Sequence, residues 1–141
     1  MQKLILIADD DAKHQKLLTD VLQAEGHSVI AARNGEIALE LARSARPCLI
    51  IMDVQMPILD GFAAIKALKA AHETRSIPAI AITALAMDGD RERLLAAGFD
   101  GYLSKPISIK ELRSEVNRQL GEKLEENRAE NGNRLTTTVD E

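Results

Sequence analysis

The chain has 141 residues and a mass of 15.4 kDa, which suits one domain with a buried core and is too short for two independent ones. Aromatic residues make up only 2% of it, so a site that stacks rings on bases or sugars is disfavoured. Residues 121–141 hold six acids and three bases, which leaves 16 of the 22 acids and 15 of the 18 bases in the rest of the chain. Because this remainder is nearly neutral and has no basic stripe, we expect no nucleic-acid partner.

The sequence also bears on the cellular compartment. A single cysteine, Cys48, cannot form an internal disulfide, which fits a reducing environment, and we expect it to be a buried small hydrophobe. The apolar run Leu4 to Ala8 ends at once in three aspartates, so it does not resemble a signal peptide. No apolar segment approaches the length of a bilayer. These observations predict a cytoplasmic protein without a membrane partner.

In chain order, five short apolar segments are the expected strands. Most of them are continuous rather than alternating, which is typical of strands buried on both faces of a parallel sheet. The expected strands are Leu4 to Ala8, Ser28 to Ala31, Leu49 to Met52, Ala79 to Thr83 and Gly101 to Ser104.

Segments with helical periodicity lie between and after these strands. The first has its apolar face at Leu17 to Leu22 and ends at Gly26, the second precedes Pro47, and the fourth is expected over Asp88 to Ala97. Capping residues predict three helix starts, at Asn34, at Asp60 and at Ser108, which has Glu111 at capping-box spacing. The alternation predicts an α/β fold of five βα units, a doubly wound parallel sheet with its ligand site beyond the carboxyl ends of the strands.

Acidic residues gather at those predicted strand ends. Asp9, Asp10 and Asp11 follow the first strand and Asp53 follows the third, while Lys105 and Pro106 follow the fifth. Parallel strands bring their carboxyl ends to one edge, so we expect Asp9, Asp10 and Asp53 to converge. Clustered carboxylates repel one another unless a proton or a cation intervenes. Oxygen ligands open to phosphate and water suit Mg²⁺, which the pattern therefore predicts as a cofactor.

Four motifs in their order and spacing resemble the receiver domains of two-component response regulators. They are the pair Asp9 and Asp10 after the first strand, the stretch from Ile51 to Gly61, Thr83 with Ala84, and the stretch from Gly101 to Pro106. The resemblance covers roughly Lys3 to Leu120. It implies a flavodoxin-like (βα)5 fold with strand order 2-1-3-4-5, and the motifs around Thr83 and Lys105 look particularly like those of stand-alone receivers.

The resemblance implies a role for each site residue. Asp53 would be the nucleophile that takes a phosphoryl group from a histidine kinase or a histidine phosphotransfer protein. Asp10, Asp53 and the backbone carbonyl of Gln55 would bind Mg²⁺, with Asp9 bound through water, and Mn²⁺ or Ca²⁺ could substitute. Lys105 would pair with a phosphoryl oxygen.

The resemblance also implies a conformational switch. The hydroxyl of Thr83 would donate to the phosphoryl group, and Tyr102 would turn into the space that Thr83 leaves. Because both residues adjoin the fourth helix, fifth strand and fifth helix, that surface would be repacked and read by a downstream protein. We expect bulky Leu85, two residues after Thr83, to slow hydrolysis of the phosphoryl group.

Ordinary structural roles compete with these interpretations. An isolated aspartate run is usually a turn and a helix N-cap, Lys105 could be a loop lysine, Thr83 the end of a strand and Tyr102 a packing ring. The three histidines, His14, His27 and His72, are expected to be solvated.

Other functions remain as alternatives. An aspartyl-phosphate phosphatase would need an acid where Gln55 stands, and a flavodoxin-like nucleotide or flavin binder would need a Gly-rich loop after the first strand. A phosphate-independent binding module would lack site residues, and none is missing.

We expect a receiver domain over residues 1–121 and a polar C-terminal tail over 122–141 that could extend the last helix. Only about twenty residues follow Leu120, too few for a DNA-binding effector domain, so output is expected through protein contacts. In the last helix Leu112, Val116, Leu120 and Leu124 recur every fourth residue, which fits either a monomer or a weak homodimer through the fourth helix, fifth strand and fifth helix.

Overall fold

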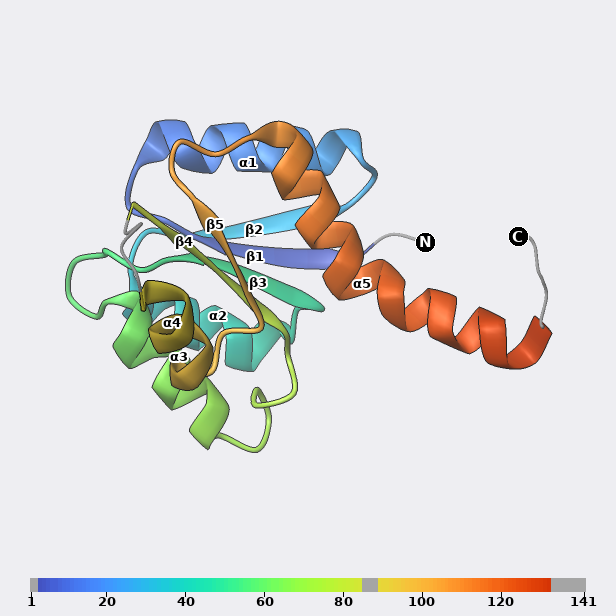
Figure 1. The fold of residues 1–141 in the computed structure, drawn as a ribbon. Coiled ribbons are helices and arrows are strands. Elements are labelled where there is room, and N and C mark those ends of the chain that lie inside the picture. Colours follow the sequence, from blue (N-terminus) through green and yellow to red (C-terminus); the bar gives the residue numbers. More distant parts are fainter. Residues whose placement is uncertain (1–2, 85–88, 133–141) are drawn as a thin grey trace.

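A computed structural model describes residues 3–84 and 89–132, with side chains as far as Gly121. In these ranges five strands alternate with five helices (Figure 1). The elements are β1 (Leu4–Ala8), α1 (Ala12–Ala24), β2 (Ser28–Ala32), α2 (Gly35–Ala45), β3 (Leu49–Asp53), α3 (Gly61–Ala70), β4 (Ala79–Thr83), α4 (Asp90–Ala97), β5 (Gly101–Ser104) and α5 (Ile109–Gly132).

The five strands form one parallel sheet in the order β2-β1-β3-β4-β5, which confirms the predicted doubly wound α/β fold. Helices α1 and α5 cover one face of the sheet, and α2, α3 and α4 cover the other (Figure 1). With helices on both faces, β3 and β4 are buried along their whole length. The continuous apolar runs of the sequence reflect this two-sided burial.

Neighbouring residues of a central strand belong to different hydrophobic cores. In β3, Leu49 and Ile51 pack in the layer beneath α1 and α5, whereas Ile50 and Met52 pack in the layer of α2, α3 and α4. This division follows from the alternation of side chains along a strand. Asp53, the last residue of the strand, therefore lies on the same face of the sheet as Leu49 and Ile51.

The predicted helix caps are present. The Asn34 side chain accepts a hydrogen bond from the backbone N–H of Ile37, and Asp60 accepts one from Ala63, both at 2.9 Å. The hydroxyl of Ser108 accepts from the N–H of Glu111 at 3.2 Å. Each cap satisfies an N–H that the helix itself leaves unpaired.

Some boundaries and environments differ from the sequence predictions. Strands β2 and β3 each extend one residue further, to Ala32 and Asp53, and α4 begins at Asp90, while Asp88 lies outside the described residues. The prediction that Cys48 is buried is wrong, because it precedes the first sheet residue of β3 and is exposed.

Helix α5 continues to Gly132 and runs past the end of the sheet (Figure 1). The first part of the expected tail is thus helical, and the domain boundary at residue 121 stays a prediction. Over the described residues, no helix combines the length and the apolar character needed to cross a bilayer.

Candidate functional site

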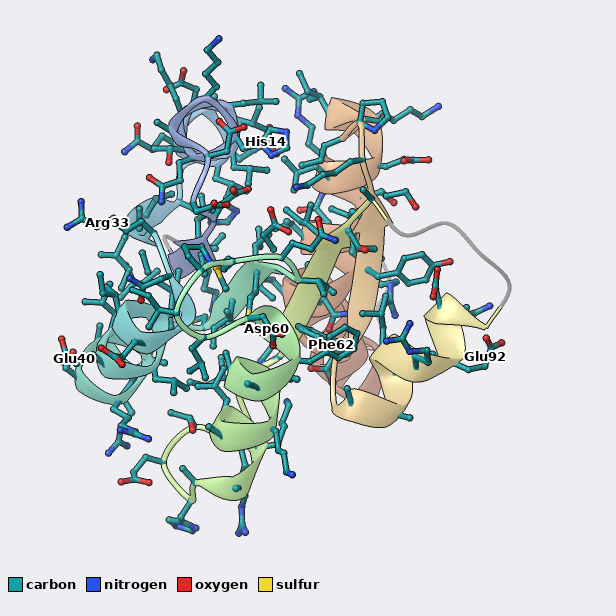
Figure 2. All side chains as sticks on the ribbon, turned by 90° about the vertical axis from the view of Figure 1, so that its left-hand side faces the viewer. His14, Arg33, Glu40, Asp60, Phe62 and Glu92 are labelled. Atoms are coloured by element: carbon teal, nitrogen blue, oxygen red, sulfur yellow. The ribbon has the colours of Figure 1, made fainter. Side chains whose placement is uncertain are left out.

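The candidate site lies at the carboxyl edge of the sheet, where β1, β3, β4 and β5 end. Figure 2 looks onto this edge and shows His14 on the first turns of α1 and Asp60 at the start of α3. Asp9 and Asp53 are almost completely buried here, with 0% and 2% of their surfaces exposed. Buried carboxylates need partners, so their contacts define the site.

Asp53, the last residue of β3, has a partner on each carboxylate oxygen. Its Oδ2 accepts a 2.7 Å hydrogen bond from the Lys105 ammonium, and its Oδ1 accepts a 3.0 Å hydrogen bond from the backbone N–H of Gln55. Lys105 is held at the end of β5 by its own N–H, which donates to the carbonyl of Thr83 at 2.8 Å. The site thus places one cation directly on the predicted nucleophile.

The acidic surroundings of the site change the pKa of Lys105. Partial burial by itself would lower the pKa of Lys105, but the hydrogen bond to Asp53 and the charges of Asp53, Asp9 and Asp10 raise it above its ordinary value. The ammonium therefore stays charged at neutral pH.

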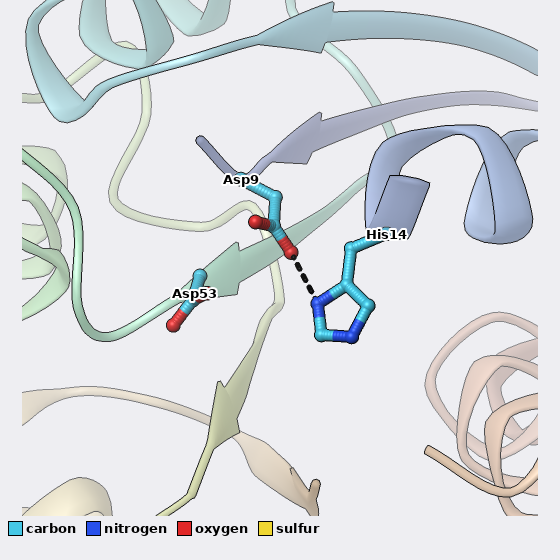
Figure 3. A group of neighbouring side chains, drawn as sticks. All are labelled: Asp9, His14 and Asp53. Atoms are coloured by element: carbon cyan, nitrogen blue, oxygen red, sulfur yellow. Dashed lines mark hydrogen bonds and ion pairs between the residues drawn. The ribbon is translucent and has the colours of Figure 1, made fainter. Parts of the chain in front are cut away.

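Asp9, immediately after β1, is the second buried carboxylate. Its Oδ1 accepts from the N–H of Asp11 at 2.9 Å, and its Oδ2 lies 3.3 Å from Nδ1 of His14 (Figure 3). Desolvation raises the pKa of Asp9 above its usual value; the Asp11 hydrogen bond lowers it again in part, and the charge of Asp53 adds to the rise. Burial and the neighbouring charge of Asp53 therefore disfavour the ionised form of Asp9.

Gln15 fixes the backbone of this acidic turn, a role that the sequence did not suggest. Its side-chain amide donates to the carbonyl of Asp9 at 2.6 Å and to the carbonyl of Ala32 at 2.9 Å. It thus ties the end of β1 to the end of β2. Asp11, the third aspartate, caps α1 by accepting from Lys13 and His14, as the ordinary reading of an aspartate run predicts.

A divalent cation fits this site by the chemistry of its donors. One ligand atom each from Asp9, His14 and Asp53 lies within 4.8 Å of the others. Asp10 is exposed beside this group, and together with Gln55 it lines an open groove of about 490 Å³ next to Asp53. Buried carboxylate oxygens and a groove open to water and phosphate are the surroundings that Mg²⁺ prefers.

Gly61 brings α3 against the end of β3. Its N–H donates to the carbonyl of Val54 at 2.8 Å, and a Cβ at this position would lie 2.7 Å from the Cα of Val54 and 2.8 Å from the carbonyl oxygen of Asp53. Only glycine allows this approach without a shift of the backbone next to Asp53. Nearby, Ile58 is 74% exposed and has a positive φ of 69°.

The two predicted switch residues lie on neighbouring strands. Thr83 is the last residue of β4 and is buried, whereas Tyr102 on β5 is 37% exposed. Tyr102 lines two grooves of about 360 and 320 Å³ that contain residues of α5 and, in the first, of α4.

The structure brings Asp9, Asp53 and Lys105 together and places Asp10, Gln55 and Thr83 around them. The expectation that His14 is solvated is wrong, because it is partly buried against Asp9. Leu85 and the side chain of Leu124 lie outside the described residues. The roles of the site residues remain predictions.

Comparisons with known proteins agree with one another. The family model of the response regulator receiver domain matches residues 5–117. The polar-differentiation response regulator DivK of Brucella anthropi is 43% identical over 122 residues, which cover 86% of this chain and 99% of DivK, and DivK of Brucella ovis is 42% identical over the same shares.

Solved structures show the same fold. The receiver domain of the sensor histidine kinase PA1611 from Pseudomonas aeruginosa, which has a magnesium ion coordinated in its active-site cleft, is 35% identical with a TM-score of 0.79, covering 86% of this chain and 99% of its own. The receiver domain of the Francisella response regulator 1452 is 31% identical with a TM-score of 0.80, covering 86% of this chain and 98% of its own.

Proposed function

Because the chain belongs to the response regulator receiver family, we propose that it accepts a phosphoryl group on Asp53 from a phosphohistidine of a histidine kinase or a histidine phosphotransfer protein. The observation that carries this proposal is the position of Asp53. Its carboxylate ends the central strand, is buried at the carboxyl edge, accepts a 2.7 Å hydrogen bond from Lys105 and lies beside Asp9.

The transfer exchanges one bond for another at phosphorus. An Asp53 oxygen attacks the phosphorus of the donor, an O–P bond forms, and the P–N bond breaks with its electron pair leaving on the donor imidazole, which takes up a proton from water. Lys105 exchanges its contact with Asp53 for one with a phosphoryl oxygen and stabilises the charge that gathers there.

Mg²⁺ would be held by Asp10, Asp53 and the backbone carbonyl of Gln55, with Asp9 bound through water. When bound, it offsets the repulsion between the phosphoryl group and the carboxylates. The raised pKa of Asp9 supports this assignment. Burial and the charge of Asp53 disfavour the ionised carboxylate, and a nearby cation would relieve that cost. Slow Mg²⁺-assisted hydrolysis of the acyl phosphate would return the domain to its resting state.

Thr83 and Tyr102 would transmit the phosphorylation. The buried Thr83 hydroxyl would donate to the phosphoryl group, and Tyr102, now 37% exposed, would turn inward. Moving a two-state equilibrium from 1:99 to 99:1 requires about 5.5 kcal/mol of differential stabilisation. A few charge-assisted hydrogen bonds at about 1.5–3 kcal/mol each can supply it.

The output would pass through protein contacts of α4, β5 and α5, either to a downstream protein or to a second copy in a weak homodimer. The grooves around Tyr102 on this surface support the proposal, because an inward turn of the ring would reshape both. We place the protein in the cytoplasm, where a histidine kinase would present its phosphohistidine.

The test is incubation of the whole chain with Mg²⁺ and acetyl phosphate, followed by intact mass measurement. We expect a phosphate-sized adduct on the wild type and none on Asp53→Asn. If the wild type binds Mg²⁺ and still gains no adduct from acetyl phosphate or from a phosphorylated phosphotransfer protein, the phosphoacceptor function is wrong, and the chain is a phosphate-independent binding module.

A further inference from the structure

In the cluster of Asp9, His14 and Asp53, His14 offers a nitrogen ligand atom, whereas the two carboxylates offer oxygen. His14 projects from the first turn of α1 toward Asp9, and its ring is partly buried, with 27% of the side chain exposed (Figure 3). The roles proposed above for the acidic residues and Lys105 leave this imidazole unused.

The separation of the donor atoms suits a common metal. Two ligands at about 2.1 Å from a metal lie about 3.0 Å apart at an octahedral angle and about 3.4 Å apart at a tetrahedral angle. Nδ1 of His14 and Oδ2 of Asp9 are 3.3 Å apart, between these values. The ligand atoms of the cluster lie at most 4.8 Å apart. Two ligands on opposite sides of a metal lie about 4.2 Å apart, so a small side-chain movement would close the difference.

The hydrogen bond to Asp9 does not prevent binding. A carboxylate oxygen can only accept, so a hydrogen bond between Nδ1 and the Asp9 carboxylate requires the proton on Nδ1. If the imidazole proton moves to Nε2, the Nδ1 lone pair faces the carboxylate, and a cation can occupy the space between them. In such a complex Asp9 binds the cation directly and loses the imidazole proton as its partner, which differs from its water-mediated contact with Mg²⁺ proposed above.

Nitrogen donors change which metal a site prefers. Mg²⁺ takes oxygen ligands almost exclusively, whereas imidazole suits later divalent metals such as Co²⁺, Ni²⁺ and Zn²⁺, and Mn²⁺ accepts both donor types. A site of carboxylates alone would discriminate less strongly in favour of these metals than one that includes an imidazole.

We propose that His14 is a nitrogen ligand of the divalent-cation site and gives this receiver a higher affinity for Mn²⁺ and Co²⁺, relative to Mg²⁺, than its carboxylates alone would provide. The proposal rests on the proposed cation site beside Asp53. It concerns which metal that site prefers and makes no change to the phosphoryl transfer itself.

The test compares the wild type with His14→Ala by calorimetric titration of Mg²⁺, Mn²⁺ and Co²⁺. Loss of an outer-sphere partner of a metal ligand already lowers affinity by about 10–100-fold, so loss of a direct ligand should weaken Mn²⁺ and Co²⁺ binding at least about tenfold. Mg²⁺ affinity should change by less than about threefold. His72→Ala is the matched control, because His72 is exposed beyond the far end of α3 and its removal should change none of the three affinities.

Pulsed electron paramagnetic resonance of the Mn²⁺ complex gives a second measurement. Modulation from a directly bound ¹⁴N nucleus is expected in the wild type and in His72→Ala, and its absence is expected in His14→Ala. Thermal melting without metal establishes that each variant is folded.

The outcomes separate this inference from the proposed function. If all three cations weaken equally in His14→Ala and the wild type shows no nitrogen modulation, His14 only orients Asp9 and the proposal is wrong. If the acetyl phosphate adduct still forms in that case, the phosphoacceptor function stands without it. A wild type that binds no divalent cation would overturn both.

Discussion

Replacement of Asp9 by Asn should stabilise the metal-free protein at neutral pH. The amide has nearly the shape of the carboxylate and can still accept from the N–H of Asp11, but it removes a buried negative charge close to Asp53. Desolvation and the charge of Asp53 raise the pKa of Asp9 above 3.8, so the folded state binds this proton more tightly than the unfolded state does. A buried charged group that is incompletely compensated costs about 1–3 kcal/mol, so we expect the free energy of unfolding to rise by an amount of this order.

The sign of the pH dependence follows from the raised pKa. A carboxyl group of this kind contributes stability while it is protonated, below its pKa in the unfolded chain, and loses that contribution as the pH rises through the higher pKa of the folded state. The gain from Asp9→Asn should therefore be largest above the folded-state pKa and fade as the pH falls toward 3.8.

Urea unfolding in the presence of a chelator, at several values between pH 4 and pH 8, measures this dependence. Asp11→Ala is the contrasting control, because hydrogen bonds from His14 and Lys13 lower the pKa of Asp11, whose contribution is present above its ordinary pKa and lost as the pH falls. A gain for Asp9→Asn that is equal at pH 4 and pH 8, or a loss at pH 8, would refute the reasoning. Added Mg²⁺ should stabilise the wild type more than Asp9→Asn, because a ligand of the folded state alone stabilises it and Asp9 is one of the carboxylates proposed to hold the ion.

Three further predictions concern the backbone and the ion pair. Gly61→Ala should lower the free energy of unfolding by about 1–3 kcal/mol, because the new Cβ would lie 2.8 Å from the carbonyl oxygen of Asp53, whereas Gly121→Ala, with nothing within 4 Å, should be neutral or stabilising in the same urea assay. Ile58→Asn should raise the free energy of unfolding by about 1 kcal/mol, because asparagine tolerates a φ of 69° and a β-branched residue does not. Ile58→Val should leave it unchanged, and equal melting temperatures for the two variants would contradict this. Lys105→Ala should lower the free energy of unfolding by about 1–3 kcal/mol, because Asp53 stays buried without its cation. It should also slow the appearance of the acetyl phosphate adduct in timed mass spectra. An unchanged rate would show that Lys105 takes no part in the transfer.

The sequence predicted those features that depend on local rules. The strands were visible because two-sided burial requires an unbroken apolar run, as in Leu49 to Met52. Asn34 and Asp60 marked helix starts because a cap bonds to N–H groups only three residues away. The meeting of Asp9 with Asp53 followed from strand direction alone, since all parallel strands end at the same edge.

The features that the sequence did not predict depend on distances across the fold. The partial burial of His14 depends on how the first turn of α1 lies over Asp9, and the two hydrogen bonds of Gln15 join the ends of β1 and β2, which are far apart in the chain. Nor did any pattern indicate that Ile58, an ordinary apolar residue within a familiar motif, has a left-handed backbone. Such contacts are set by tertiary packing, for which a single sequence has no local signal.

Each central strand contributes side chains to two hydrophobic cores, and this limits where residues can be inserted into the protein. One residue added inside β3 would exchange Ile50 and Ile51 between the layers and displace Asp53 at the same time. The connections at the opposite edge, such as residues 71–78 between α3 and β4, lie away from the residues to which we assign a role. A fluorescent reporter or a purification tag inserted near His72, which is exposed, should therefore leave both cores in register and the carboxyl edge intact.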